Sequence, residues 1–266
     1  MKKKALVVDN DFFFVEFLTE LLSKRGYDVT KGYDGQEGIT RLNEGSVDVV
    51  FVDMLMPKID GKQMIQYCRQ QFPNARFPII ALSGTLVEKP EDVQKIGADY
   101  YIAKCPITAM NDHINQFMDR LEKQSFPCND NQEDIQSPVQ LYPRQSTVEL
   151  MDAIDFQEAM FESIGAGIFV TDKRGIIIKA NEYGLEITEK SIGDVLNCHV
   201  TTLVHLSEKS RFAEALKKIA SHREMNRVLL DVAIDAGKVH CIISLLRVNQ
   251  EALGWIVAME SMKLHR

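Results

Sequence analysis

The first 122 residues alternate between short apolar runs and segments with helical periodicity. The apolar runs cover 4–8, 27–30, 47–52, 77–82 and 100–103, and the helical segments cover 11–25, 35–44, 61–71, 88–97 and 107–122. Strands separated by helices of this length are typical of βαβ units, in which a parallel sheet carries helices on both faces. The pattern therefore predicts an α/β doubly wound domain with five parallel strands over residues 1–123.

The pattern changes after this domain. Residues 124–147 are polar, contain three prolines, and predict a flexible linker without a core of its own. A helical segment (149–164), a strand–turn–strand with its turn at Asp172–Gly175, and short helices follow. A longer helix (208–222) precedes the last strands, near 227–235, 239–248 and 253–260. This order predicts an α+β domain over residues 148–266, built on an antiparallel five-stranded sheet.

The composition and charge of the chain bear on which partners it can bind and in which cellular compartment it works. The net charge is −7 and no Lys/Arg-rich run occurs, so the sequence gives no sign of nucleic-acid or membrane binding. The apolar run after the basic start is too short for a signal peptide, and no run reaches the length of a membrane span. The five cysteines (68, 105, 128, 198 and 241) lack metal-type spacing. We therefore expect a cytoplasmic protein with reduced thiols.

Polar residues follow the predicted parallel strands where each strand ends. The stretch Asp9–Asp11 follows the first strand, and Asp53, Ser83 and Lys104 end the third, fourth and fifth. In such sheets, chemistry collects at the carboxyl ends of the strands. Carboxylates at this edge suit Mg²⁺, while a lysine and a hydroxyl suit an anionic group, so the set points to phosphoryl transfer. Taken singly, Asp11 could simply cap the next helix, and Lys104 could be a solvated lysine.

Residues 3–122 resemble the receiver domain of bacterial response regulators. The motifs that carry the resemblance are Val7–Asp11, Val52–Gly61, Ala81–Gly84 and Gly97–Lys104. The resemblance implies a flavodoxin-like fold and a receiver that takes a phosphoryl group from a histidine kinase or phosphotransfer protein. It also implies that the receiver catalyses this transfer and its own dephosphorylation, and that the chain is otherwise no enzyme.

The same resemblance assigns roles to residues of this chain. Asp53 is the expected phosphoacceptor, and Ser83 and Lys104 are expected to contact the phosphoryl group. Mg²⁺ would be bound by Asp9, Asn10, Asp53 and the backbone carbonyl of Leu55. Tyr101 occupies the position of the family's aromatic switch, and it would move with Ser83 toward the new charge.

Two positions depart from the family pattern. Asn10 stands where the family usually has a second acid, and the lost charge predicts weaker Mg²⁺ binding unless Asp11 compensates. Cys105 separates Lys104 from Pro106, whereas the family has lysine followed directly by proline, typically through a cis bond. A cis bond before Cys105 would cost about 2.5–4 kcal/mol, so Lys104 is held either by strain or in a shifted position.

The second domain resembles a PAS domain, with Phe169–Asn181 as its most characteristic stretch. The resemblance implies a sensing or dimerising module, and we expect a packed core rather than a haem or flavin site. Cys198 and the histidines at 199, 205 and 222 are therefore interpreted as ordinary core or surface residues. The leading helix carries an apolar stripe with one polar break, at Leu150, Ile154, Gln157, Phe161 and Ile164. The stripe suggests a homodimer through this helix and domain; the alternative is packing on its own sheet.

These observations predict a two-component response regulator that relays phosphorylation of Asp53 through the PAS domain to partner proteins or a dimer. Two alternatives stay open. The chain could be the amino-terminal part of a hybrid sensor histidine kinase, or a receiver that no longer accepts phosphate and serves as a docking module. The sequence names neither the kinase, nor the pathway, nor a ligand of the second domain.

Overall fold

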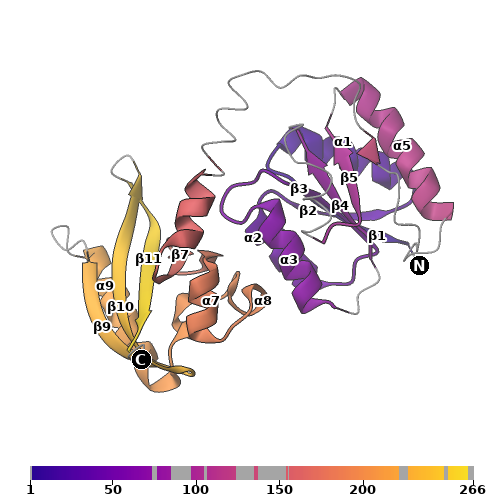
Figure 1. Cartoon of the computed structure of the whole chain (residues 1–266). Coiled ribbons are helices and arrows are strands. Elements are labelled where there is room, and N and C mark those ends of the chain that lie inside the picture. The colour runs from indigo at the N-terminus through magenta and orange to yellow at the C-terminus, as the bar shows by residue number, and fades with distance from the viewer. Residues whose placement is uncertain are drawn as a thin grey trace. The chain divides into compact units, whose positions relative to one another are not determined.

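The computed structural model describes residues 2–73, 77–84, 97–104, 107–123, 135–136, 154, 156–221, 227–248 and 251–262. The chain divides into two compact units, Met1–Met151 and Asp152–Arg266, which are described separately (Figure 1). The predicted boundaries of the linker, after residue 123 and after residue 147, stay predictions. Within the described residues, no helix combines the length and apolar character needed to cross a bilayer.

The first unit contains the predicted parallel sheet. Its strands are β1 (Lys4–Val8), β2 (Asp28–Gly32), β3 (Val49–Asp53), β4 (Ile79–Ser83) and β5 (Tyr100–Ala103). They pair in the order β2-β1-β3-β4-β5, all parallel, which confirms the five-stranded prediction. A two-residue strand, β6 (Ile135–Gln136), pairs with β5 from the segment predicted to be an unstructured linker. The prediction missed β6 because the open edge of β5 offers backbone groups to any extended segment, whatever its sequence.

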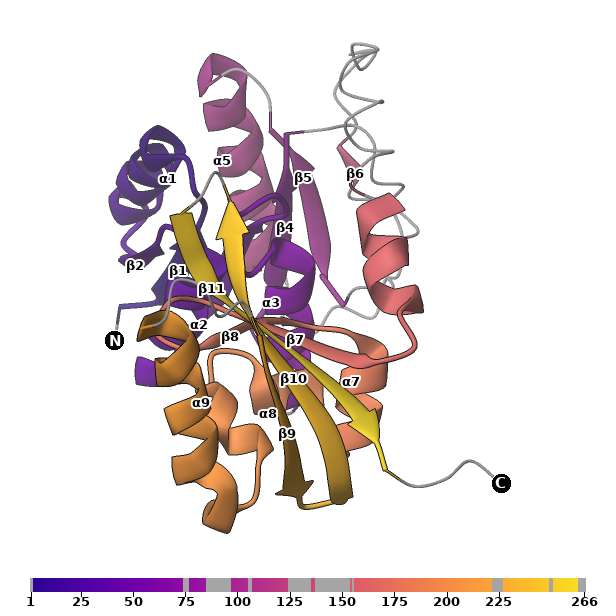
Figure 2. The ribbon, with the colours of Figure 1, turned by 90° about the vertical axis from the view of Figure 1, so that its left-hand side faces the viewer.

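Helices cover both faces of this sheet (Figure 2). They are α1 (Phe12–Lys24), α2 (Gly35–Glu44), α3 (Gly61–Gln71) and α5 (Ile107–Lys123). Helices α1 and α5 share one apolar cluster with the strands, whereas α2 and α3 contact each other. Residues 88–96 of the helix predicted over 88–97 lie outside the described residues. The described helices confirm the doubly wound arrangement.

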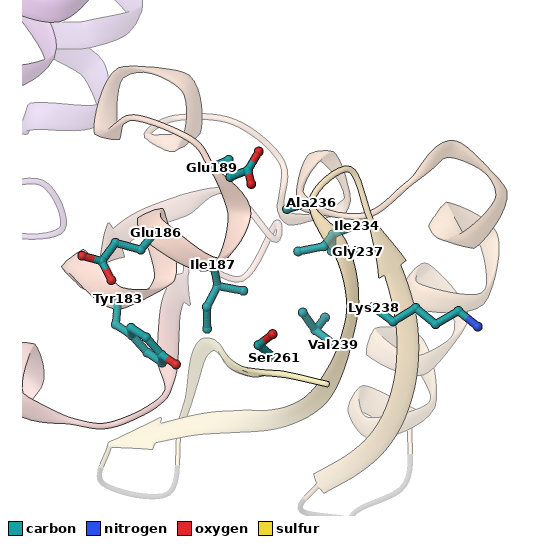
Figure 3. A pocket seen from close by; sticks show the side chains of 10 residues that line it. All are labelled: Tyr183, Glu186, Ile187, Glu189, Ile234, Ala236, Gly237, Lys238, Val239 and Ser261. Carbon is teal, nitrogen blue, oxygen red and sulfur yellow. The ribbon is translucent and has the colours of Figure 1, made fainter. Parts of the chain in front are cut away.

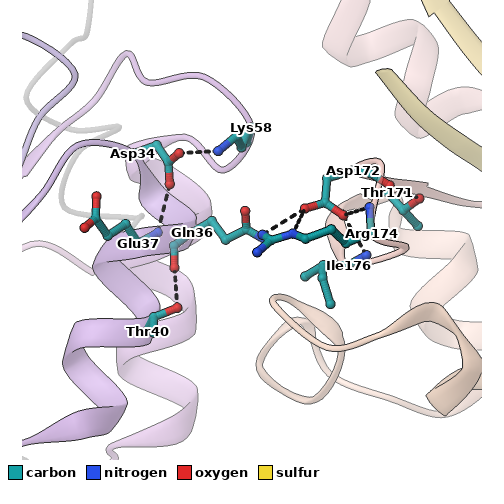
Figure 4. A network of polar contacts seen from close by, with 9 residues as sticks. All are labelled: Asp34, Gln36, Glu37, Thr40, Lys58, Thr171, Asp172, Arg174 and Ile176. Atoms are coloured by element: carbon teal, nitrogen blue, oxygen red, sulfur yellow. Dashed lines mark hydrogen bonds and ion pairs between the residues drawn. The ribbon is translucent and has the colours of Figure 1, made fainter. Parts of the chain in front are cut away.

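Aspartates at the ends of loops fix where three of these helices begin. Asp11 Oδ1 accepts hydrogen bonds from the N–H groups of Phe13 and Phe14, at 2.9 and 3.3 Å. Asp34 accepts from the N–H of Glu37 at the start of α2 and pairs with Lys58 (Figure 4). Asp60 forms a capping box at the start of α3. Because these caps satisfy N–H groups that the helix leaves unpaired, they set the chain direction beside each strand end.

Gly61 allows α3 to begin directly against the end of β3. A Cβ atom at this position would lie 2.3 Å from the carbonyl oxygen of Asp53, which no side chain can tolerate. The N–H of Gly61 also donates to the carbonyl of Met54, at 3.1 Å. The start of α3 therefore supports the backbone that presents Asp53.

The second unit contains an antiparallel sheet, as predicted. Its strands are β7 (Gly167–Thr171), β8 (Ile177–Ala180), β9 (Arg227–Ile234), β10 (Gly237–Val248) and β11 (Glu251–Ser261), in the order β8-β7-β11-β10-β9. Its helices are α7 (Glu182–Thr188), α8 (Ile192–Val195) and α9 (Lys209–Ser221), with the 3₁₀ turns η1 (Val200–Leu203) and η2 (Leu206–Glu208). Figure 1 shows β9, β10 and β11 as long, twisted neighbouring strands. Residues 156–163, ahead of β7, are helical.

The turn between β7 and β8 is one residue longer than predicted. The carboxylate of Asp172 accepts hydrogen bonds from the N–H groups of Arg174 and Ile176, both at 2.9 Å, and pairs with the Arg174 guanidinium (Figure 4). Ile176 forms a bridge with His199 and so leaves the hairpin ladder. The aspartate therefore organises the turn locally, and pairing outside the hairpin sets its length.

One face of the second sheet is buried under helices. Phe169, Ile243 and Val257 face inward from three adjacent strands and are 0% exposed. Helix α9 packs on β9 and β10 and contributes the buried Phe212. This face holds the core of the second unit, and its large side chains fill the space between sheet and helices.

Asn181 joins the leading helix to this core. Its side chain is fully buried, and its Oδ1 accepts hydrogen bonds from the N–H groups of Ile168 (2.7 Å) and Gly184 (2.9 Å). Its Nδ2 donates to the carbonyls of Ala166 (2.9 Å) and Phe161 (3.3 Å). One side chain thus connects the leading helix, the start of β7 and the start of α7.

Candidate functional site

Three charged side chains meet at the carboxyl ends of β1, β3 and β5. Nζ of Lys104 lies 2.7 Å from Oδ2 of Asp9 and 2.7 Å from Oδ1 of Asp53. Both carboxylates are buried, with Asp9 0% and Asp53 4% exposed. The structure therefore brings together the three residues that the sequence placed at separate strand ends.

Backbone hydrogen bonds hold each of these residues in place. Oδ1 of Asp9 accepts from the N–H of Asp11 at 2.9 Å, and the N–H of Lys104 donates to the carbonyl of Ser83 at 2.6 Å. The N–H of Leu55 donates to the carboxylate of Asp53. Because loops directly after the strands supply these bonds, the geometry of the sheet fixes the geometry of the site.

Oδ2 of Asp9 is buried, and no described residue directs a hydrogen-bond donor at it. Lys104 Nζ is close enough to form an ion pair with this atom, but it lies outside hydrogen-bonding geometry. A buried carboxylate oxygen with a free lone pair, beside a second carboxylate, suits a hard cation such as Mg²⁺. Among the described residues, no three His, Cys, Asp or Glu side chains gather into a metal-type cluster. The residues present fit Mg²⁺, with fewer charges than a three-acid site would supply.

Phe14 completes the surroundings of Lys104. Nζ of Lys104 lies 4.7 Å from the centre of the Phe14 ring, which is only 6% exposed. A cation over an aromatic face is attracted to its π electrons by about 0.5–2 kcal/mol. Sequence reasoning missed this residue. The available signal was the cap at Asp11, which sets the first turn of α1 and so places Phe14 against the sheet.

The other predicted site residues lie around this centre. Ser83 ends β4, the strand next to β3, and is 1% exposed. Tyr101 lies on β5 and is half-buried, whereas Asn10 is exposed. Leu55 is 42% exposed and lies two residues after Asp53, in the loop that follows β3. Cys105 and Pro106, the second departure from the family pattern, lie outside the described residues.

The environment of Asp53 changes the pKa of its carboxyl group. Burial raises the pKa of Asp53 from 3.8 to about 6, although Lys104 opposes the change and Asp9 adds to it. A carboxyl with this pKa is mostly ionised at neutral pH and mostly protonated in mild acid.

This raised pKa predicts a pH dependence of stability in metal-free buffer. Because the folded state binds the proton of Asp53 more tightly than the unfolded state, the contribution to stability is complete below about pH 4. This contribution to the free energy of unfolding, up to about 3 kcal/mol, is lost as the pH rises through about 6. Urea unfolding of wild type and Asp53→Asn in EDTA, between about pH 4 and pH 7, measures this loss. The variant should lack it, and the exposed Asp28→Asn should retain it; identical slopes in all three proteins would contradict the prediction.

In the second unit, two of the predicted ordinary histidines act as local caps. Nδ1 of His199 accepts from the N–H of Thr201 at 3.3 Å, and Nδ1 of His205 accepts from the N–H of Ser207 at 3.4 Å. His222 lies outside the described residues. Cys198 is a half-buried free thiol, and burial raises its pKa.

A surface groove of about 200 Å³ lies beside α7 (Figure 3). The side chains of Ile187, Ile234 and Val239 line it, with Glu186 and Glu189 among its charged residues. It lies between α7 and the ends of β9 and β10 that carry the buried Ile234 and Val239.

The leading helix differs from the predicted stripe. Ile154 and Ile164 are exposed as expected, at 41% and 45%, but Phe161 lies against Lys179 of β8, whose Nζ is 4.9 Å from the ring centre. Phe156 and Met160, which the stripe did not include, are exposed instead. Leu150 lies outside the described residues. Phe161 therefore packs on its own unit, in line with the alternative reading of the stripe.

A buried aspartate at the end of the third parallel strand, paired with a lysine beside a second aspartate, defines a receiver-type signalling domain. Residues 5–115 match the family model described as the response regulator receiver domain. Residues 155–259 match the model described as the PAS fold. The chain therefore carries a response regulator receiver domain, which is a phosphoryl-accepting signalling domain, followed by a PAS domain.

The relatives of the first unit are response regulators. The chain is 35% identical over 109 residues to the alkaline phosphatase synthesis transcriptional regulatory protein PhoP of Bacillus subtilis; this covers 39% of the chain and 43% of the relative. It is 32% identical over 109 residues to the regulatory protein VanRc of Enterococcus gallinarum, with 39% and 44% covered. The chain thus spans less than half the length of these relatives. A solved Francisella response regulator 1452 receiver domain is 30% identical, with 45% of this chain and 98% of that one covered and a TM-score of 0.38.

Proposed function

We propose that this chain is a two-component response regulator that accepts a phosphoryl group on Asp53. The observation that carries the proposal is the buried Asp53 carboxylate at the end of β3, 2.7 Å from Lys104 and beside Asp9. The phosphodonor would be a histidine kinase or a phosphotransfer protein in the cytoplasm. Apart from this transfer and its own dephosphorylation, the chain would be no enzyme.

In the proposed step, a carboxylate oxygen of Asp53 attacks the phosphorus atom of a phosphohistidine. The new O–P bond forms as the N–P bond breaks, and the donor imidazole leaves with the bonding electron pair and takes up a proton. The ammonium of Lys104 neutralises charge on the transferred oxygens, and Ser83 would donate to one of them. Phe14 and the Ser83 carbonyl keep Lys104 at the reacting edge.

Asp9, Asn10, Asp53 and the carbonyl of Leu55 would hold Mg²⁺ in this site. The free lone pair of the buried Asp9 Oδ2 supports this assignment. The ion would supply charge neutralisation for the phosphoryl oxygens. Asn10 can offer only a neutral carbonyl oxygen, so the affinity is proposed to be lower than in a site with one more acid.

The signal would leave the receiver through Ser83 and Tyr101. Ser83 and Tyr101 lie on the neighbouring strands β4 and β5, and Tyr101 is half-buried, so its exposure can change. The second unit would pass the new state to partner proteins or to a dimer formed through the PAS domain and its leading helix. The exposed Phe156 and Met160 of that helix support this last element.

Mass spectrometry after incubation with Mg²⁺ and acetyl phosphate tests the proposal. Wild type is expected to gain one phosphoryl group, whereas Asp53→Asn is expected to gain none. A beryllofluoride mimic should change the NMR signals or ultraviolet absorbance of Tyr101 in wild type alone. Asp28→Asn, at an exposed position, serves as the matched control. Equal behaviour of wild type and Asp53→Asn at several millimolar Mg²⁺ would overturn the proposal.

Asn10→Asp is expected to strengthen Mg²⁺ binding by about tenfold, because charge count tunes the affinity of carboxylate sites. Isothermal titration calorimetry of wild type and variant measures the change. Asp11→Asn is the matched control: Asp11 caps α1 with its carboxylate, so Mg²⁺ affinity should stay near that of wild type. A loss of affinity in Asp11→Asn as large as the gain in Asn10→Asp would instead make Asp11 the compensating ligand.

A second candidate function is a docking receiver that does not accept phosphate. The observation that favours it is Asn10, a neutral residue next to Asp9, which together with Asp53 supplies the carboxylates beside Lys104. It predicts that even Asn10→Asp stays unmodified by acetyl phosphate. The hybrid histidine kinase alternative is not favoured, because the relatives are regulatory proteins and neither matched family is a kinase.

A further inference from the structure

The groove beside α7 combines an apolar floor with an acidic rim (Figure 3). Ile187 of α7, Ile234 at the end of β9 and Val239 near the start of β10 line it. Ile234 is 6% exposed and Val239 is 2% exposed, so both belong to the core of the unit, and the groove reaches down to that core. The floor of the groove therefore offers a bound molecule apolar contacts.

The groove has room for a small organic molecule. Its volume is about 200 Å³, whereas a cavity of about 150 Å³ in another protein binds one benzene ring. Ala236 and Gly237, at the tip of the β9–β10 hairpin, also line the groove, and their small size leaves this space open. A molecule with one ring, or with a chain of about six carbon atoms, would therefore fill it.

The charge at the rim of the groove is negative. Figure 3 shows the carboxylate of Glu189 at the rim, whereas the ammonium of Lys238 and the carboxylate of Glu186 point away from the centre. The basic residue that follows Glu189, Lys190, pairs with Asp235 at 4.0 Å. Glu189 also ends α7, whose last turn contains no basic residue, and the carboxyl end of a helix favours cations. The rim therefore attracts positive charge.

We propose that this groove binds a small primary amine, whose apolar body packs on Ile187 and Val239 and whose ammonium lies at the carboxylate of Glu189. Burial of apolar surface supplies the affinity, and the carboxylate supplies the preference for a cation. A neutral alcohol of the same shape would gain the apolar contacts alone. The site goes beyond the proposed function, because neither Asp53 nor Mg²⁺ takes part in it.

NMR of the isoleucine methyl groups in the full chain, titrated with 2-phenylethylamine or with 2-phenylethanol, tests the proposal. The two probes share their ring and chain and differ only in the ammonium or hydroxyl group. The signals of Ile187 and Ile234 are expected to shift with the amine, at a dissociation constant of about 1 mM. The alcohol should bind about three- to fivefold more weakly, which is the effect of one exposed ion pair. Ile80, buried in β4 of the first unit, should not shift.

Two variants separate the effect of charge from the effect of shape. Glu189→Gln keeps the size of the side chain, so it should lower the affinity for the amine to that for the alcohol and leave the alcohol unaffected. Ala236→Phe should abolish binding of both probes, because the ring fills the groove. Glu214→Gln and Ala220→Phe are the matched controls, since both positions are exposed on α9. An unchanged signal of the fully buried Ile243 shows that a variant keeps its fold.

Each of three results would overturn the proposal. The first is an Ile187 signal that stays unchanged up to about 20 mM amine, well above the expected dissociation constant. The second is equal affinity of wild type for the two probes, which would make the groove an apolar site without preference for a cation. The third is a shift of the Ile187 signal on dilution without any probe, which would assign the groove to a second copy of the chain. Because these signals report on the second unit, the outcome does not depend on whether Asp53 accepts phosphate.

Discussion

Lys104→Met is expected to lower the free energy of unfolding of the first unit by about 3–5 kcal/mol in metal-free buffer near pH 7. The variant keeps much of the side-chain volume but removes the only cation within 4 Å of Asp9 and Asp53 among the described residues. Two buried carboxylates then face each other without compensation. The pKa of Asp53, already raised to about 6, should rise further.

Urea unfolding of wild type and Lys104→Met, with and without several millimolar Mg²⁺, measures this effect. Lys58→Met is the matched control, because Lys58 also pairs with an aspartate but is 44% exposed. Loss of that surface pair should cost at most about 1 kcal/mol. Mg²⁺ should restore part of the stability lost in Lys104→Met alone. Equal losses in the two variants would mean that burial of the Asp9–Asp53 pair has no energetic consequence.

Asn181→Ala is expected to destabilise the second unit by about 2–4 kcal/mol, because it removes four hydrogen bonds from a fully buried side chain. The N–H of Ile168 would be left buried without an acceptor. The carbonyl of Phe161 would lose its hydrogen bond to Asn181, so the leading helix should unfold locally more often than the sheet does.

Hydrogen exchange followed by mass spectrometry distinguishes this effect from general destabilisation. Peptides covering 156–163 should lose protection first, while peptides from β10 should lose it only in proportion to the global change. Asn111→Ala, at an exposed position on α5, removes the same side chain and should leave both regions unchanged. Uniform loss of protection across the second unit would show that Asn181 stabilises the core without anchoring the helix.

Much of the fold of the first unit was predictable, because parallel strands have a characteristic hydrophobic pattern in the sequence. A strand buried on both faces, such as Val49–Asp53 with its apolar run Val49–Val52, has a continuous apolar sequence, and the topology places its carboxyl end next to those of its neighbours. The meeting of Asp9, Asp53 and Lys104 follows from that topology alone. The cap at Asp11 was also visible in advance, as one of two readings that the sequence left open.

Other features depend on contacts that no local pattern encodes. Phe14 belongs to the apolar face of a helix, and only the three-dimensional structure shows that its ring lies beside a lysine ninety residues away. The strand β6 forms because a neighbouring edge is open, not because its two residues favour it. The four partners of Asn181 come from three elements, so the sequence showed only a turn-forming asparagine after a strand.

The apolar stripe predicted for the leading helix matches the exposed face only in part, at Ile154 and Ile164, because Phe161 contacts its own unit. A spacing of three and four residues identifies one face, but it does not say which side of the helix the rest of the unit will use. Phe161 faces its own unit because its ring packs under Lys179. Phe156 and Met160 lie on the exposed face of the helix. Helical periodicity alone could not choose between these two faces.

The order β8-β7-β11-β10-β9 has a consequence for how the second unit is made on the ribosome. Its first strand, β7, pairs on one side with β8 and on the other with β11. Phe169 of β7 therefore has no partner on the second side until Val257 of β11 has been synthesised. Until Glu251–Ser261 has been synthesised, the hairpin has an open edge in the middle of the future sheet. Pairing across so long a stretch of chain is slow, because the intervening loop must close first. The nascent second unit is therefore exposed to mispairing until its last strand emerges, whereas β1 of the first unit finds β2 within a few tens of residues.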